Sequence, residues 1–290
     1  MRFGRGALSA GEAKARADAA ALEFIALSEK SAPLLSASPP EKRKAPALSR
    51  NDLRMGMMSA VAGYVDAAGF VTLVGLFPAH VTGELVGAAV ALSSGQLLRN
   101  PSRLAILPIF VFSVVLGALV SRSFRKRGKS PLAALLVLMA FTLAFFSASD
   151  AVLPVFVRPT SGMTTALREG TAVAAMGFQN VIMRRVLSTS CPTTVMTGNL
   201  TQFIIELVEL ILGRRKSKMG ERSQVHSEAD LRLRLVSLAL GAFTVCAVLG
   251  GYLTTTFGTV SVALPALLVC AMAVSELRRP TAASRTGTLF

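Results

Sequence analysis

Residues Leu104–Val120 read LAILPIFVFSVVLGALV, seventeen consecutive positions without a charged side chain. Similar apolar runs occupy Leu132–Phe146, Leu235–Leu253 and Val260–Val274. The hydrocarbon core of a bilayer is about 30 Å thick, and a helix needs roughly 20 mostly apolar residues to cross it. Several runs approach that length, and one soluble core cannot bury them all. The sequence therefore predicts an all-α polytopic membrane protein.

Composition supports this class and excludes others. Charged residues make up 16% of the chain, against about 25% in a typical soluble domain, and the mean hydropathy is +0.56. The net charge of +15 comes from short clusters between apolar runs, and there is no Trp and only two Tyr for base stacking. We therefore expect the lipid bilayer as a partner, and no nucleic acid. Three Cys without CxxC spacing and two His predict no metal site and no cofactor.

The apolar runs predict about six transmembrane helices. They are expected at Met55–Leu76, Leu104–Val120, Leu132–Leu153, Thr171–Leu187, Leu233–Thr255 and Thr259–Ser275. Two further apolar stretches, Glu84–Leu98 and Leu200–Gly213, have about 14 residues each, or about 21 Å of helix. They follow polar or Pro-containing breaks at Phe77–His80 and Ser188–Pro192. We expect both to be broken or re-entrant half-helices.

Flanking charges indicate the topology and the domain limits. Residues 1–50 form a basic tail, expected to be disordered or to lie as a helix on anionic lipid. Residues 51–276 form the membrane domain, and residues 277–290 a second tail. With six spans, the positive-inside rule places both tails and the cluster Arg122–Lys129 in the cytoplasm. The alternative of eight spans would move that cluster to the other side.

A motif occurs twice in the chain. The first copy is GYVD at Gly63–Asp66, followed by VTGEL at Val81–Leu85. The second is GFQN at Gly177–Asn180, followed by MTGNL at Met196–Leu200. The two parts are displaced by 114 and 115 positions. This order predicts an internal repeat.

We expect repeat one at about 53–155 and repeat two at about 168–276. Each would contribute three spans and one half-helix, and an odd number of spans inverts one repeat relative to the other. Many secondary transporters have this architecture, with interrupted helices at matching places beside the binding site. Interrupted backbone at membrane depth is tolerated only inside protein or beside water.

These two motif copies, with Phe77 between the parts of the first, resemble the bacterial YoaK-like family, a domain of unknown function (DUF1275). The resemblance covers about Leu53 to Ser275. It implies a multi-pass protein of the bacterial inner membrane without a settled biochemical activity. The family pattern has Thr-Gly-Asn in the first half, whereas this chain has Glu84, so a neutral amide role is not carried over to that position.

The repeat and its breaks supply the candidate residues for a substrate or coupling-ion site. They are Asp66, Gln179, Asn180, Thr82, Gly83, Glu84, Thr197, Gly198 and Asn199, followed by His80 and Arg184. No catalytic residues are predicted, because no nucleotide-binding loop or hydrolase motif is present.

Asp66 stands out, because a carboxylate within a span faces the bundle interior or water and often serves ion or proton coupling. The alternative is a structural hydrogen bond to the other repeat. The amides of Gln179 and Asn180 fit polar lining or helix–helix hydrogen bonding. The Thr-Gly breaks fit either substrate contact or helix capping, and Arg184 fits snorkelling to the interface.

The sequence therefore predicts a secondary transporter or permease for a small solute or ion, with Asp66 exchanging a proton. The alternative is a membrane scaffold or an intramembrane enzyme. A water-accessible cavity beside Asp66 would favour transport, whereas tight packing of Asp66 against Asn180 would favour a scaffold. No motif indicates the solute or the oligomeric state.

Overall fold

The computed structural model describes residues 48–73, 75–95, 102–156, 162–187, 196–216 and 224–279. The chain divides into two units, Met1–Pro46 and Ala47–Phe290, and all described residues belong to the second. The tails expected at 1–50 and 277–290 therefore lie almost entirely outside the described residues, as does the break expected at Ser188–Pro192.

Every regular element in the described ranges is a helix. They are α2 (Arg50–Thr72), α3 (Val81–Ser93), α4 (Ser102–Lys126), α5 (Leu132–Phe156), α6 (Gly162–Arg185), α7 (Met196–Lys216), α8 (Gln224–Phe257), the 3-10 helix η3 (Gly258–Val262) and α9 (Ala263–Leu277).

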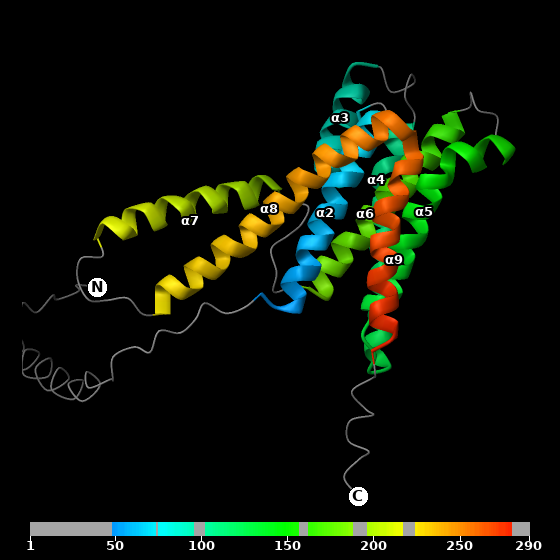
Figure 1. Cartoon of the computed structure of the whole chain (residues 1–290). Coiled ribbons are helices and arrows are strands. Elements are labelled where there is room, and N and C mark those ends of the chain that lie inside the picture. Colours follow the sequence, from blue (N-terminus) through cyan, green and yellow to red (C-terminus); the bar gives the residue numbers. More distant parts are fainter. Residues whose placement is uncertain are drawn as a thin grey trace, which may run out of the picture. The chain divides into compact units, whose positions relative to one another are not determined.

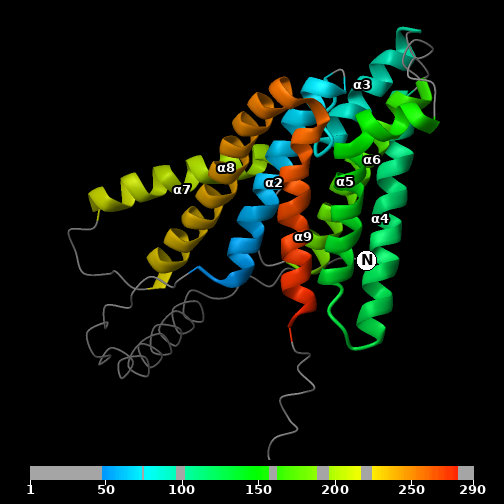
Figure 2. The ribbon, with the colours of Figure 1, turned by 45° about the vertical axis from the view of Figure 1, so that its right-hand side comes forward.

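The long helices alternate in direction (Figures 1 and 2). Helices α2, α5 and α8 run one way, and α4, α6 and α9 run the other. The start of α2, the connection between α4 and α5, and the end of α9 therefore lie at one end of the bundle. Helix α3 lies at the opposite end, whereas α7 extends sideways from the bundle.

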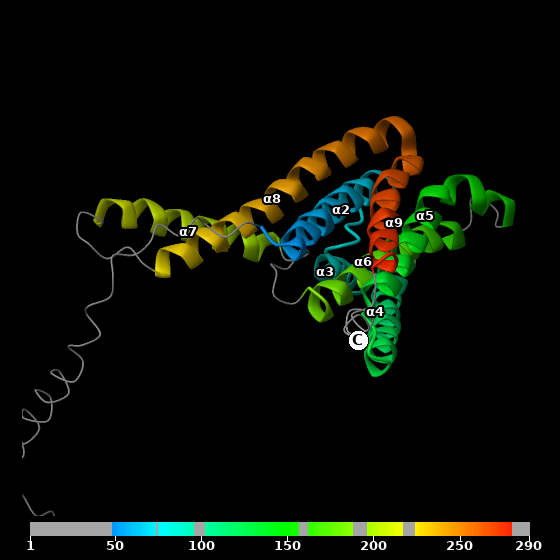
Figure 3. The ribbon, with the colours of Figure 1, turned by 60° about the horizontal axis from the view of Figure 1, so that its bottom comes forward.

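Packing pairs the first half of the chain with the second. Helix α2 lies along α8, which Figure 3 shows from another side, and α4 lies along α6. Helix α5 packs against both α6 and α9. The two shorter or lateral helices stay within their own halves, because α3 contacts α4 and α7 contacts α8.

The start of α2 is fixed by local sequence. The Ser49 side chain accepts a hydrogen bond from the Asp52 N–H at 3.2 Å, and the Asp52 carboxylate accepts one from the Ser49 N–H at 2.7 Å. This capping box satisfies two N–H groups that a helix start leaves without partners. The helix therefore begins at Arg50, five residues before the expected span.

Three described helical stretches are long and apolar enough to cross a membrane. They are Ala105–Lys126, Leu132–Pro154 and Leu231–Leu277, with mean hydropathies of 2.1, 2.2 and 2.2. The last stretch contains both α8 and α9, joined by η3. The protein is therefore a membrane-embedded helical protein. Helices α2 and α6 are not apolar enough to count as membrane spans by hydropathy.

Burial explains why α2 and α6 are less apolar than their neighbours. In α2 the buried positions include Ser59, Gly63 and Asp66, and in α6 they include Glu169 and Gln179. Helices that face other helices rather than lipid need small and hydrogen-bonding residues. By contrast, the outer helices expose large apolar side chains that suit bilayer contact: Val111, Phe112, Val115 and Leu119 in α4, and Val245, Val248 and Tyr252 in α8.

The expected half-helices differ in length. Helix α3 has 13 residues, close to the expected 14. Helix α7 has 21 residues, so the expectation of a short half-helix at Leu200–Gly213 is wrong in length. The helix begins four residues earlier, at Met196, and its polar end with Arg214, Arg215 and Lys216 remains helical.

Two ion pairs join the first helix of each half to the last helix of the other. Arg54 in α2 pairs with Glu276 in α9, and Arg168 in α6 pairs with Asp150 in α5. The helix directions put these pairs at opposite ends of the bundle. The two arginines are 114 positions apart, the same displacement as Gly63 and Gly177.

Gly63 permits the close approach of α2 and α8. A Cβ atom at this position would lie 2.1 Å from the backbone carbonyl oxygen of Phe243 and 2.9 Å from its carbon. Backbone atoms cannot move aside as a flexible side chain does, so any side chain at Gly63 must push the two helices apart.

We therefore expect Gly63→Ala to destabilise the protein by on the order of 1–3 kcal/mol. The midpoint of thermal unfolding of the detergent-purified chain should fall clearly. Gly241→Ala in α8 is the matched control, because a Cβ there meets nothing within 4 Å and alanine favours helix. Equal midpoints for the two variants would contradict this packing.

Candidate functional site

The connection between α2 and α3 is an ordered break whose described N–H groups all have partners. Gly75, Leu76 and His80 donate to backbone carbonyls within or just before the break. The Phe77 N–H donates to Glu84 Oε1 at 3.1 Å, and the Ala79 N–H donates to Asp66 Oδ1 at 2.7 Å. Unpaired N–H groups at membrane depth cost several kcal/mol. The two carboxylates therefore hold the break in place.

Asp66 has a second partner that the sequence reading did not foresee. Its Oδ2 atom lies 2.5 Å from His80 Nδ1, and Asp66 is 3% exposed. Residue 66 is well inside α2, and the chain returns to it 14 residues later. A carboxylate and an imidazole in direct contact can pass a proton from one side chain to the other.

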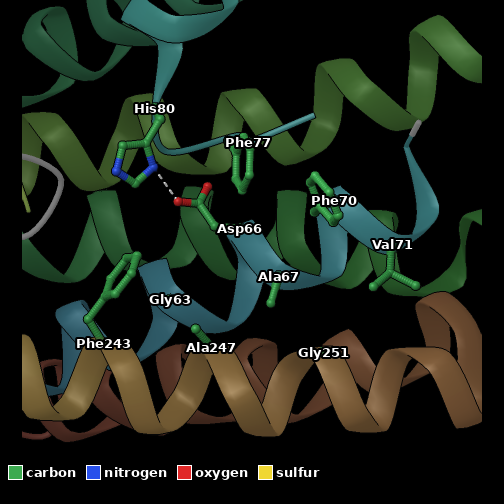
Figure 4. Close-up of a pocket in the computed structure, with 10 residues that line it drawn as sticks. All are labelled: Gly63, Asp66, Ala67, Phe70, Val71, Phe77, His80, Phe243, Ala247 and Gly251. Atoms are coloured by element: carbon green, nitrogen blue, oxygen red, sulfur yellow. Dashed lines mark hydrogen bonds and ion pairs between the residues drawn. The ribbon is translucent and has the colours of Figure 1, made fainter. Parts of the chain in front are cut away.

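The Asp66–His80 pair lines a cavity of about 570 Å³ between α2, the break and α8. Figure 4 shows the Asp66 carboxylate and the His80 ring facing each other, with Phe243 of α8 below the ring in this view. The ring centroids of His80 and Phe243 are 6.1 Å apart, and those of His80 and Phe77 are 6.2 Å apart. We call this space the acidic cavity. Its ten lining residues are Gly63, Asp66, Ala67, Phe70, Val71, Phe77, His80, Phe243, Ala247 and Gly251.

His80 also lines a second cavity, of about 580 Å³, between α3, α4 and α6. We call this space the basic cavity, because Arg184 and Arg185 contribute to its wall. Thr82 and Asn180 add a hydroxyl and an amide, and the remaining lining is apolar. One imidazole thus borders both cavities.

The lining residues of the two cavities are related by constant displacements along the chain. Adding 114 to Asp66, Ala67, Phe70 and Val71 of the acidic cavity gives Asn180, Val181, Arg184 and Arg185 of the basic cavity. Adding 133 to Phe110, Val114 and Ala118 of the basic cavity gives Phe243, Ala247 and Gly251 of the acidic cavity. In this sense we call the two spaces counterparts, and they carry different polar groups at the matching positions.

Other predicted site residues are separated rather than gathered. Asn180 lies in the basic cavity, where its Nδ2 donates to the Met176 carbonyl at 3.0 Å, so Asp66 and Asn180 line different spaces. Gln179 is fully buried and donates to the Met58 carbonyl of α2 at 2.9 Å. This bond joins the first helices of the two halves, as expected of a helix–helix amide.

The second Thr-Gly motif opens α7. Thr197 and Gly198 are exposed and Asn199 is buried, and none of the three lines the acidic or the basic cavity. In the first motif Thr82 lines the basic cavity, Gly83 is exposed at the first turn of α3, and Glu84 is buried beneath the break. The structure therefore does not bring the two motifs to one shared site.

The sequence reading missed the α8 wall of the acidic cavity. Phe243, Ala247 and Gly251 lie on one face of that helix. A signal was present, since Phe243 precedes Gly250 by seven positions and Phe110 precedes Gly117 by the same interval.

These features define a class: a membrane-embedded, all-helical protein in which a buried carboxylate pairs with a half-buried imidazole at an interrupted helix. The model of the family described as "Protein of unknown function (DUF1275)" matches residues 55–275, and the chain belongs to this family. No curated protein and no solved structure matches the chain.

Proposed function

We propose that this protein is a secondary transporter of the bacterial inner membrane that couples movement of a small solute or ion to a proton carried by Asp66. The observation that carries the proposal is the placement of the Asp66–His80 pair between two counterpart cavities. A carrier needs a site that two repeats can expose in turn, and a buried titratable pair suits the coupling.

The proposal includes six crossings arranged as two inverted repeats, α2–α5 and α6–α9. Reciprocal packing supports it. Gly63 approaches the backbone of Phe243, while Gly177 approaches Ser113 and the Phe110 carbonyl. Tyr64 packs on Gly250, while Phe178 and Val181 pack on Gly117. The first helix of each half thus meets the third helix of the other half, α2 with α8 and α6 with α4.

The two ion pairs support inversion as well. Equivalent arginines in equivalent helices lie at opposite ends of the bundle, which an inverted repeat requires and a parallel repeat forbids. In this arrangement both ends of the membrane domain and the Arg122–Lys129 cluster face the cytoplasm.

Topology is testable by cysteine labelling in a variant without Cys191, Cys246 and Cys270. Lys129→Cys, after α4, should react with a membrane-impermeant maleimide only in inside-out vesicles. Thr256→Cys, at the far end of α8, should react only in right-side-out vesicles. The reverse result, or reaction of both from one side, contradicts six crossings with a cytoplasmic cluster.

Alternating access is testable at the counterpart positions Ala247 and Val114. Each is partly exposed and lines one cavity. We expect Ala247→Cys and Val114→Cys to be labelled from opposite sides of the membrane, because inversion turns the cavities to opposite faces. Gly241→Cys, on the outer surface of α8 facing lipid, is the unreactive control.

The rival class is a scaffold in which Asp66 and Glu84 only satisfy the N–H groups of the break. Their bonds to Ala79 and Phe77 favour it. A scaffold needs no water-filled path, so failure of both cavity cysteines to react with the maleimide would support the scaffold and reject the carrier.

A further inference from the structure

The basic cavity differs from its counterpart in charge, and this difference points to a ligand. Where the acidic cavity has Phe70 and Val71, the basic cavity has Arg184 and Arg185. Where the acidic cavity has the carboxylate of Asp66, the basic cavity has the amide of Asn180. At these three matching positions the basic cavity is therefore more positive than the acidic cavity: it has two arginines in place of apolar residues and an amide in place of a carboxylate.

Among the described residues, no carboxylate shares the basic cavity with its two arginines. Its fourteen lining residues include no Asp or Glu. Within the described part of the chain, no ion pair involves Arg184, whereas Arg54 and Arg168 each have an acidic partner. The Asp66 carboxylate is engaged on the other side of His80, by the imidazole and the Ala79 N–H.

The polar groups around this space are hydrogen-bond donors that suit an anion. Arginine binds carboxylate and phosphate groups through two parallel N–H bonds. The Thr82 hydroxyl adds a donor, and His80 adds another in its protonated form. The Asn180 amide, whose Nδ2 donates to the Met176 carbonyl, carries no charge that would repel an anion. The volume of about 580 Å³ lies within the range of small-molecule sites.

We infer that the basic cavity binds a small organic anion through a carboxylate or phosphate group held by Arg184 and Thr82, beside the neutral amide of Asn180. The inference names the substrate class of the proposed transporter and therefore rests on that proposal. Because His80 borders both cavities, an anion in the basic cavity would lie beside the imidazole whose other side is held by Asp66. The apolar wall formed by Leu107, Phe110 and Val114 would accept the hydrocarbon part of the anion.

Binding can be measured without flux, so its failure is distinguishable from failure of the carrier. The full chain is placed in nanodiscs of phosphatidylcholine, a zwitterionic lipid, without detergent. It is titrated with succinate and, separately, with inorganic phosphate, and the midpoint of thermal unfolding is measured at each concentration. We expect a saturable rise with at least one probe, and Arg184→Gln should weaken the apparent affinity at least tenfold. Asn180→Asp places a carboxylate at the position that matches Asp66. This carboxylate should repel the anion and abolish binding.

Arg122→Gln is the matched control, because it removes the same charge from an exposed position outside the cavity. It should change the affinity by less than twofold. Equal weakening in Arg122→Gln and Arg184→Gln would show a diffuse charge effect and overturn the site. Absence of any shift in the unmodified chain at millimolar succinate and phosphate would overturn it as well.

A lipid headgroup carries the same phosphate chemistry, so a second arm uses nanodiscs containing phosphatidylglycerol. A small-anion site predicts that the succinate or phosphate response survives in these discs. If phosphatidylglycerol is retained in an Arg184-dependent manner and the free anions have no effect, the cavity is a lipid site and the inferred solute class is wrong.

Discussion

Asp66→Asn is expected to abolish proton-coupled flux in proteoliposomes while the protein still folds. The asparagine Oδ1 can accept the hydrogen bond from the Ala79 N–H that Asp66 Oδ1 accepts at 2.7 Å, so the break keeps its geometry. The amide cannot take up a proton and cannot form the charged pair with His80. Solute flux driven by a pH gradient should therefore fall to the level of empty liposomes.

Glu84→Gln separates coupling from loop support. Glu84 is also buried and also holds the break, through the Phe77 N–H, but it has no imidazole partner and lines neither the acidic nor the basic cavity. A glutamine can accept the same hydrogen bond, so flux and its pH profile should remain. If Asp66→Asn transports with the unmodified pH profile, Asp66 has no part in coupling.

The pH profile itself should depend on His80. His80→Gln keeps a hydrogen-bonding side chain beside Asp66 but removes the imidazole that pairs with its Oδ2 atom. Without the imidazole, no proton can pass between residue 80 and the Asp66 carboxylate. We expect the pH dependence of flux in this variant to differ from that of the unmodified chain, measured over a series of external pH values. An unchanged profile would place His80 outside the coupling step.

Much of the membrane architecture follows from the apolar runs, because lipid-facing helices must be apolar along their length. Helices α4, α5, α8 and α9 lie where the runs at Leu104, Leu132, Leu235 and Val260 predict them. The break at Phe77–His80 also lies where it was expected, since Pro78 cannot donate a backbone hydrogen bond. Local composition decides these features.

The limits of the central helix α6 are harder to predict from composition. Helix α6 begins at Gly162, nine residues before the expected span. The expected span starts too late because the first turns of the helix contain the polar residues Thr164, Arg168 and Glu169, which lower the hydropathy there. Thr164 and Glu169 are buried in the protein, and Arg168 is paired with Asp150. Hydropathy measures the tendency to face lipid, and these side chains face protein.

The arrangement of the candidate residues does not follow from the sequence. Asp66 and His80 are both candidates by residue type, but nothing in their spacing shows that the imidazole returns to the carboxylate. The displacement of 114 positions relates Asp66 to Asn180, but equivalence under an inverted repeat does not mean contact. Each residue contributes to its own cavity, and the tertiary packing of α2 on α8 and α4 on α6 decides which.

The two counterpart ion pairs are buried to different degrees, and this makes the two ends of the bundle unequal. The side chains of Arg54 and Glu276 are 13% and 9% exposed, whereas those of Arg168 and Asp150 are 25% and 44% exposed. Glu276 also accepts from Arg279 Nη1 at 2.8 Å, so one carboxylate balances two guanidinium groups. An inverted-repeat carrier that exposes one face at a time would show this kind of inequality, with one end held more tightly than the other.

Glu276→Gln should therefore be the most destabilising single substitution of a charged residue among these pairs. It leaves Arg54 and Arg279 close together without a counterion. For these half-buried charges the cost lies between the about 0–1 kcal/mol of an exposed pair and the about 3–5 kcal/mol of a fully buried one. Asp150→Asn removes the counterpart acid from a more exposed pair, where an ion pair contributes about 0–1 kcal/mol. The midpoints of thermal unfolding of the two variants, compared in the same detergent, measure the difference. Because the Arg54–Glu276 pair ties the start of α2 to the end of α9, its loss should also raise maleimide labelling of whichever cavity cysteine reacts from the cytoplasmic side. Equal destabilisation by both substitutions, with no change in labelling, would mean that the two ends are held alike and that neither ion pair acts as a gate.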